Sequence, residues 1–112
     1  MNEALLLQQF ESREFVLKTQ QQISKDFAAI GCPFHSDFEQ TPLRTEVILE
    51  QIQFQLNEVQ KQSSSLLHQL IYQIDLPENV YIEALSSEDP TKQLAEIILR
   101  REAYKVYLRS RF

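Results

Sequence analysis

The chain has 112 residues, of which 43% are apolar and 24% are charged, and this balance excludes an intrinsically disordered protein. Its length is that of one ordinary domain, so we expect residues 1–112 to form a single helical-bundle domain. Apolar runs such as Leu5–Leu7 and Ile97–Leu99 fall far short of the roughly 20 residues that cross a bilayer. We therefore expect no membrane-spanning helix and no membrane partner.

The use of cysteine and the N-terminal residues indicate a compartment. Cys32 is the only cysteine, so an intramolecular disulfide is excluded and a reducing environment is expected. The stretch that begins at Met1 lacks the basic start and the apolar length of an export signal. We therefore expect a cytoplasmic protein.

The net charge of −5 is divided unevenly along the chain. Residues 1–89 carry 5 basic and 14 acidic side chains, whereas residues 90–112 carry 6 basic and 2 acidic ones. A basic last segment indicates either contact with nucleic acid or docking on acidic neighbours within the fold. The docking interpretation is favoured, because an acidic protein repels phosphate unless its cations form an exposed patch.

Residues 3–30 carry apolar side chains at helical spacings, which predicts one long helix. Glutamines between the apolar positions, among them Gln20 and Gln22, predict a solvated side. Gly31, the only glycine, predicts the C-terminal end of this helix.

Residues 31–42 are the longest irregular stretch, and Thr41 followed by Pro42 predicts the start of the next helix. An apolar stripe then continues in phase to about Asp75. Because serine breaks helices only mildly, one continuous helix over 42–75 is favoured over two helices that divide at Ser63–Ser65.

Two acidic turns follow. Asp75 and Glu78 have the spacing of a capping box, which predicts a short helix to about Leu85. Asp89 before Pro90 predicts the start of the last helix. The rigid acidic turn around Pro77 also has the character of a docking feature, although capping explains it adequately.

These elements predict an all-α fold, an antiparallel helical bundle of three long legs with the third leg broken near Ser86–Pro90. The alternative is a four-helix bundle with a bend at Ser63–Ser65.

The last helix is apolar on nearly all sides, which is typical of a helix that is central or shared with a partner. A chain of this length surrounds few helices, so we expect a homodimer in which a second copy covers the helix, with docking of another protein as the alternative. The candidate partner-binding residues are Leu99, Tyr104, Val106, Tyr107 and Leu108.

Cations follow the same helix at steps of four residues, at Arg101, Lys105 and Arg109, with Arg100 and Arg111 on a second line. Basic residues near a helix C-terminus complement its dipole and pair with acidic neighbours, which is the favoured interpretation. The alternative is that Arg101, Lys105 and Arg109 contact phosphates of nucleic acid.

Little in the chain indicates catalysis. Cys32 and His35 have the spacing of half a metal site, but the other half is missing, and Cys32 has no evident pocket in which His35 would activate it. One glycine cannot build a glycine-rich phosphate loop. We therefore predict no catalytic, cofactor-binding or metal-binding residues and no cofactor.

By elimination, the favoured function is that of a non-catalytic helical protein–protein interaction module, such as an adaptor, a subunit or a small regulator. A nucleic-acid-associated protein that uses its basic last helix is the alternative, and an enzyme with a Cys32/His35 site stands third.

Overall fold

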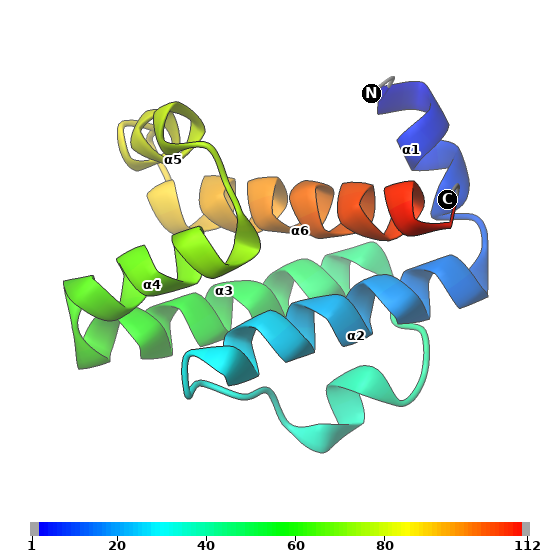
Figure 1. The fold of residues 1–112 in the computed structure, drawn as a ribbon, viewed down its shortest axis with the longest axis horizontal. Coiled ribbons are helices and arrows are strands. Elements are labelled where there is room, and N and C mark those ends of the chain that lie inside the picture. Colours follow the sequence, from blue (N-terminus) through cyan, green and yellow to red (C-terminus); the bar gives the residue numbers. More distant parts are fainter. Residues whose placement is uncertain (1–2, 111–112) are drawn as a thin grey trace.

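The computed structural model describes residues 3–110, and every regular element in this range is helical (Figure 1). The predicted all-α helical bundle is therefore confirmed. The elements are α1 (Glu3–Gln9), α2 (Arg13–Ala29), the 3-10 helix η1 (Ser36–Glu39), α3 (Thr45–Gln62), α4 (Ser64–Ile74), α5 (Glu78–Leu85) and α6 (Pro90–Arg109).

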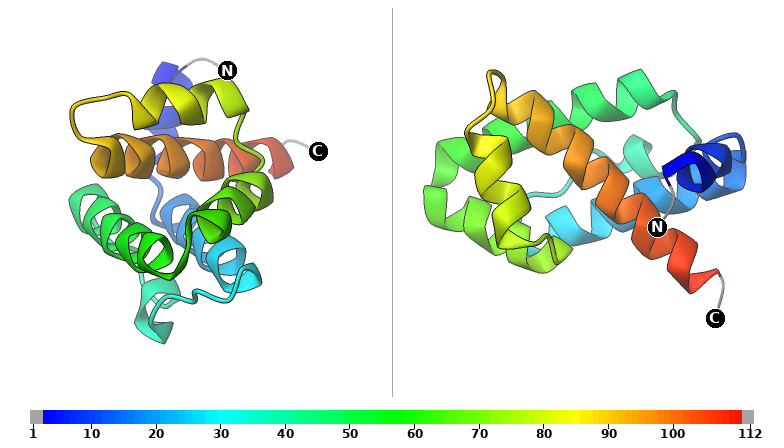
Figure 2. Two further views of the ribbon diagram at one scale, coloured as in Figure 1. Left: turned by 90° about the vertical axis from the view of Figure 1, so that its left-hand side faces the viewer. Right: turned by 90° about the horizontal axis from the view of Figure 1, so that it is seen from above.

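The helices form three layers, and α6 is the middle one (Figures 1 and 2). On one side of α6 lie α2, α3 and α4, and on the opposite side lie α1 and α5. All five of these helices contact α6. The last helix is apolar on most sides because its own chain surrounds it, so its composition does not require a second copy.

The core is continuous through these layers. Its largest fully buried side chains come from α2, η1, α3, α4 and α6, among them Phe27, Phe38, Ile52, Leu70 and Ile98. A smaller cluster joins α1 to the C-terminal part of α6 and includes Leu6, Phe15, Ala103 and Val106.

The single N-terminal helix predicted over 3–30 is wrong, because the chain turns between α1 and α2. Ser12 is extended, with φ −86° and ψ 119°, and its Oγ accepts a hydrogen bond from the Phe15 backbone N–H at 3.3 Å. A serine in this position satisfies an otherwise unpaired N–H at the start of a new helix. The turn allows α1 to pack on α6 instead of extending α2.

The end of α2 at Gly31 is confirmed. Gly31 has φ +81°, its N–H donates to the Ala28 carbonyl at 2.9 Å, and the Cys32 N–H donates to the Phe27 carbonyl at 3.0 Å. This pair of bonds is the Schellman motif, which favours glycine because of the left-handed backbone.

Two predictions about the next segment are corrected. Helix α3 begins at Thr45 after Arg44, not at Pro42, since the buried Gln20 side chain holds the preceding loop. Gln20 Nε2 donates to the carbonyls of Phe38 at 2.7 Å and Thr41 at 2.9 Å, and its Oε1 accepts from the Leu43 N–H at 2.8 Å. The expected solvated position of Gln20 is therefore wrong.

The favoured continuous helix over 42–75 is also wrong, and the division at Ser63–Ser65 is confirmed. Ser63 is fully extended, and its Oγ accepts from the Leu66 N–H at 3.0 Å, so it ends α3 and caps α4. A serine hydroxyl offers the backbone this alternative to a helical bond.

The turn at Asp75 ends a helix and does not cap the next one, which corrects the predicted capping box. Asp75 has φ +65°, its N–H donates to the Tyr72 carbonyl at 3.1 Å, and the Leu76 N–H donates to the Ile71 carbonyl at 3.1 Å. These bonds repeat the Schellman pattern of Gly31 with an aspartate at the left-handed position. Pro77 then precedes α5 without a side-chain cap.

The start of the last helix is confirmed. The Asp89 carboxylate accepts from the Lys92 N–H at 3.3 Å, with Pro90 in the first turn of α6. The break at Ser86–Pro90 is a reversal, after which α6 runs beneath α5 (Figure 2).

Candidate interaction groove

The predicted partner-binding residues of α6 divide into two sets. Leu99 and Val106 are buried among this chain's own helices, so neither is offered at the surface. Tyr104 and Tyr107 are half-buried, and Leu108 is exposed. A partner that docks on α6 would reach only these last three.

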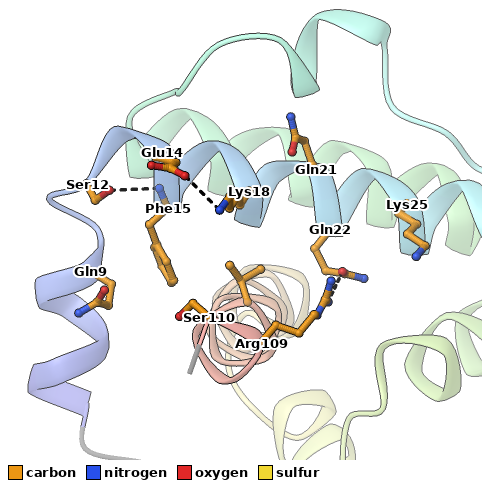
Figure 3. A pocket seen from close by; sticks show the side chains of 11 residues that line it. Gln9, Ser12, Glu14, Phe15, Lys18, Gln21, Gln22, Lys25, Arg109 and Ser110 are labelled. Atoms are coloured by element: carbon orange, nitrogen blue, oxygen red, sulfur yellow. Dashed lines mark hydrogen bonds and ion pairs between the residues drawn. The ribbon is translucent and has the colours of Figure 1, made fainter. Parts of the chain in front are cut away.

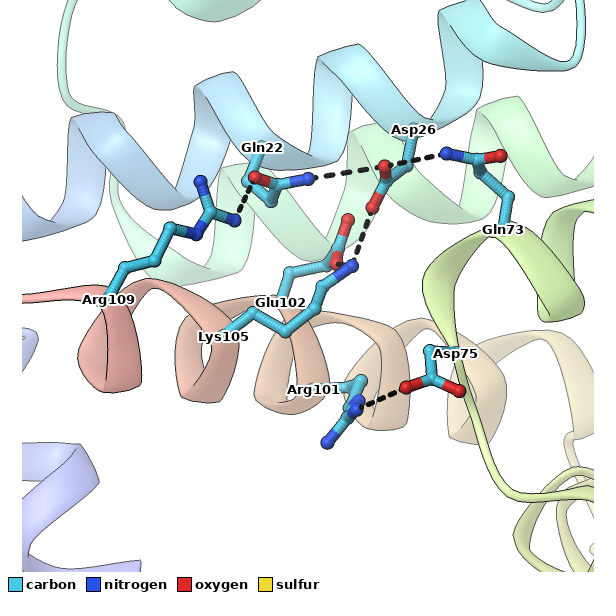
Figure 4. Close-up of polar contacts among 8 residues, drawn as sticks. All are labelled: Gln22, Asp26, Gln73, Asp75, Arg101, Glu102, Lys105 and Arg109. Carbon is cyan, nitrogen blue, oxygen red and sulfur yellow. Dashed lines mark hydrogen bonds and ion pairs between the residues drawn. The ribbon is translucent and has the colours of Figure 1, made fainter. Parts of the chain in front are cut away.

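The predicted basic line is also divided, because each step of four residues turns a side chain by about 40° around a helix of 3.6 residues per turn. Arg101 Nη2 lies 3.0 Å from Asp75 Oδ2, beside the turn that follows α4. Lys105 and Arg109 point toward α2, where they contact Asp26 and Gln22 respectively (Figure 4). The second line is similar: Arg100 pairs with Glu3 at 3.4 Å, and Arg111 lies outside the described residues.

A buried acid pair lies between α2 and α6. Lys105 Nζ lies 2.8 Å from Asp26 Oδ2 and 2.5 Å from Glu102 Oε1, and both carboxyl groups are almost inaccessible to water (Figure 4). Gln22 and Gln73 each donate an amide hydrogen bond to Asp26 Oδ1, at 3.2 and 3.3 Å. Lys105 and these two amides therefore hold one carboxylate from three helices, α6, α2 and α4.

The two carboxyl groups have opposite pKa shifts. Burial, together with the adjacent Asp26, raises the pKa of Glu102 to about 9, so Glu102 is protonated at neutral pH. Burial also acts to raise the pKa of Asp26, but hydrogen bonds from Glu102 and Lys105 outweigh it and hold that pKa below its usual value. The cluster is thus a carboxylate, a neutral acid and an ammonium group with no net charge.

Sequence reasoning missed this cluster. Asp26 and Gln22 lie four residues apart beside the apolar stripe of α2, a spacing that places them on one face but does not say which helix covers it. The solvated position expected for Gln22 is wrong, since its side chain is buried against Arg109 and Asp26.

The structure separates Cys32 from His35. The Cys32 side chain is buried in the core and its Sγ accepts from Gln62 Nε2 at 3.5 Å. His35 is exposed, and its Nδ1 accepts from the Asp37 backbone N–H at 3.2 Å, so it caps η1. Within residues 3–110, no three histidine, cysteine or carboxylate side chains are grouped as metal ligands.

An apolar groove of about 330 Å³ lies over α6, between α1 and the turn that leads into α5. Its floor is one face of α6, and its walls come from the two helices that lie on that side of the molecule (Figure 1). The lining residues are Glu3, Leu6, Leu76, Pro77, Val80, Ile97, Arg100, Arg101 and Tyr104.

The α6 residues in this groove follow the spacing of one helical face. Ile97, Arg101 and Tyr104 lie at steps of four and three, and the guanidinium of Arg101 lies 5.9 Å from the centre of the Tyr104 ring. The groove therefore joins one predicted partner-binding residue to one predicted phosphate-contacting residue. Its walls were not predicted, because Leu6 and Val80 lie far apart in the sequence and reach the groove only through the turns after α1 and α4.

No protein-family model, curated protein or solved structure matches this chain. None of the helices described here is long and apolar enough to cross a membrane.

Proposed function

We propose that this protein is a non-catalytic protein–protein interaction module, and that the groove over α6 receives an amphipathic helix of its partner. The observation that carries the proposal is the apolar groove itself, which a half-buried face of α6 and two separate walls form. Hollows of this shape bind helices through apolar anchors at spacings of three, four and seven residues.

The dimensions of the groove support this mode of binding. Ile97 and Tyr104 are seven residues apart, which corresponds to about 10 Å along α6, or two turns of a docked helix. Tyr104 and Arg101 are residue types that contribute strongly at interfaces, because each combines apolar area with a hydrogen-bonding end. Leu108, one turn further along α6 and exposed, extends the apolar surface beyond the groove.

The contacts of the basic residues favour this function over nucleic-acid binding. Arg101 and Lys105 pair with carboxylates of other elements, and Arg109 contacts Gln22. Because carboxylates neutralise two of these three cations, the residues do not form the continuous exposed stripe that the successive phosphates of a nucleic acid need. Nucleic-acid association through these three residues therefore remains the less favoured proposal.

The polar groups also favour a non-catalytic role. Cys32 and His35 lie in different environments, one in the core and one in solvent. The buried cluster of Asp26, Glu102 and Lys105 does not line the groove. Catalysis needs reacting groups that a substrate can reach.

The partner is either another protein or a second copy of this chain, and the single cysteine supports a cytoplasmic location. The test places a photo-crosslinking amino acid at Val80, in the wall of the groove, and separately at Phe54, an exposed aromatic on α3. We expect a defined protein adduct in cells of the native host from position 80, and none from position 54.

Two further measurements identify the partner. Tyr104→Ala and Ile97→Asp should abolish the adduct from position 80, whereas Phe54→Ala should not. Light scattering distinguishes a second copy from another protein, because a monomer has a mass of 13.2 kDa. Equal adducts from positions 80 and 54, or an adduct that survives both groove substitutions, would contradict the proposal.

A further inference from the structure

A second hollow, independent of the groove, lies between α2 and the C-terminal part of α6. Its volume is about 560 Å³, and α2 provides most of its wall (Figure 3). The cations Lys18, Lys25 and Arg109 line it, against the single carboxylate of Glu14. In a chain with a net charge of −5, this cavity is a local concentration of positive charge.

The cations are arranged around one residue, Gln22. On α2, Lys18 precedes Gln22 by four residues and Lys25 follows it by three, so the two lysines lie one turn to either side. Arg109 reaches the same point from α6, where its guanidinium donates to Gln22 Oε1 (Figure 3). Three cationic side chains from two helices therefore line the same cavity.

Arg109 is held in place from inside the protein. The Gln22 side chain is more than nine-tenths buried, and its amide nitrogen donates to Asp26 Oδ1 at 3.2 Å, which orients its oxygen toward Arg109 (Figure 4). Asp26 is in turn fixed by Lys105 and Gln73. A guanidinium fixed by a buried hydrogen-bond chain loses less freedom when it binds an anion than a free surface cation does.

The remaining charges leave room for an anion. Lys18 pairs with Glu14 at 3.1 Å, but both side chains are largely exposed, so the pair contributes little and exchanges readily. Within residues 3–110, Lys25 has no ion-pair partner, and four of the five N–H donors of Arg109 are not used by Gln22.

We propose that this cavity binds the phosphate group of a small phosphorylated molecule. A planar guanidinium with two flanking ammonium groups matches the three oxygens and the two charges of a phosphate monoester. Phe15 and Val106, which are largely buried, also line the cavity and give the rest of such a molecule a small apolar contact area.

Calorimetric titration with phenyl phosphate at low ionic strength tests the proposal. We expect saturable one-site binding to the wild-type protein, about tenfold or more weaker binding to Arg109→Ala, and a smaller loss for Lys25→Ala. Lys61→Ala is the matched control, because Lys61 is an exposed, ion-paired lysine on α3 that does not line the cavity. Its affinity should equal that of the wild type.

The role of Gln22 as a positioning residue has its own readout. Gln22→Ala should weaken binding several-fold, and the double variant with Arg109→Ala should lose no more than Arg109→Ala alone, because the effect of Gln22 acts through the guanidinium. Circular dichroism and thermal melts establish that each variant is folded.

Three outcomes would overturn the proposal. They are the absence of saturable binding to the wild type, an equal affinity of Arg109→Ala and Lys61→Ala, and binding of a single-stranded oligonucleotide that phenyl phosphate does not displace. The last would assign the cations to a polyanion surface and not to a small ligand.

Discussion

Two ion pairs on different sides of α6 show how burial changes the meaning of the same contact. Lys105–Asp26 and Arg101–Asp75 have similar distances, 2.8 and 3.0 Å, but Asp26 is 3% exposed in its side chain and Asp75 is 85% exposed. The first pair fixes α6 against α2 in the core, whereas in the second pair the Asp75 carboxylate is exposed to solvent and Arg101 is half-buried beside the groove. Distance alone therefore says little about what an ion pair contributes to stability.

Removing the cation of the buried pair should have the largest effect. Lys105→Met leaves the Asp26 carboxylate buried without its counter-charge, and we expect a loss of about 3–5 kcal/mol in the free energy of unfolding. Urea denaturation at neutral pH measures it. Arg100→Met is the control on the other side of α6, where the exposed contact with Glu3 predicts a loss under about 1 kcal/mol. Equal losses for the two variants would contradict the comparison.

The pH dependence of stability should show the neutral state of Glu102. Its pKa is raised to about 9 in the folded protein from an ordinary value of 4.5, so between these values the folded state binds the extra proton. The contribution of Glu102 to the free energy of unfolding is therefore fully present below pH 4.5. It decreases as the pH rises toward 9, by at most about 1.4 kcal/mol per pH unit.

The substitution Glu102→Gln isolates this effect, because an amide resembles the protonated acid and does not titrate. Between pH 6 and pH 8 the wild type should lose stability relative to Glu102→Gln, by at most about 2.7 kcal/mol. Asp26 contributes a pH dependence of the opposite sign. Because its pKa is lowered in the folded state, its ionised form stabilises the fold above its unfolded pKa, and this stabilisation is lost as the pH falls. Parallel pH profiles of wild type and Glu102→Gln would show that Glu102 is ionised in the fold.

The exposed pair should have the smallest effect. Asp75→Asn removes the charge that faces Arg101 but keeps a residue that tolerates the left-handed backbone at φ +65°. We expect a change in unfolding free energy under about 1 kcal/mol, measured by urea denaturation. Asp75→Ala, which also strains the backbone, should lose more than Asp75→Asn, and the reverse order would contradict the role assigned to this turn.

Local rules predicted the helix ends well where one residue dominates. Gly31 and Asp89–Pro90 were correct because each end depends on hydrogen bonds and dihedral angles within about four residues. Ser12 was missed and Ser63 was underestimated, because a mid-segment serine is compatible with either a helix or a cap, and packing selects between them. Asp75 was assigned to the wrong side of its turn for the same reason.

The candidate groove was only partly predictable. The helical spacing of Ile97 and Tyr104 places them on one face of α6, but which face remains open depends on where α1 and α5 pack. The apolar character of α6 suggested a missing partner, whereas five helices of the same chain contact it.

The sequence by itself determined that this chain folds as helices, with an apolar stripe on each long segment and ends at its glycine and its aspartate–proline pair. These features depend on backbone geometry and on neighbours a few residues away. Only the tertiary structure decided that Gln20, Asp26 and Glu102 are buried and that α6 keeps one open face. Burial of a polar side chain depends on partners far away in the sequence, and no local pattern encodes which segments will cover it.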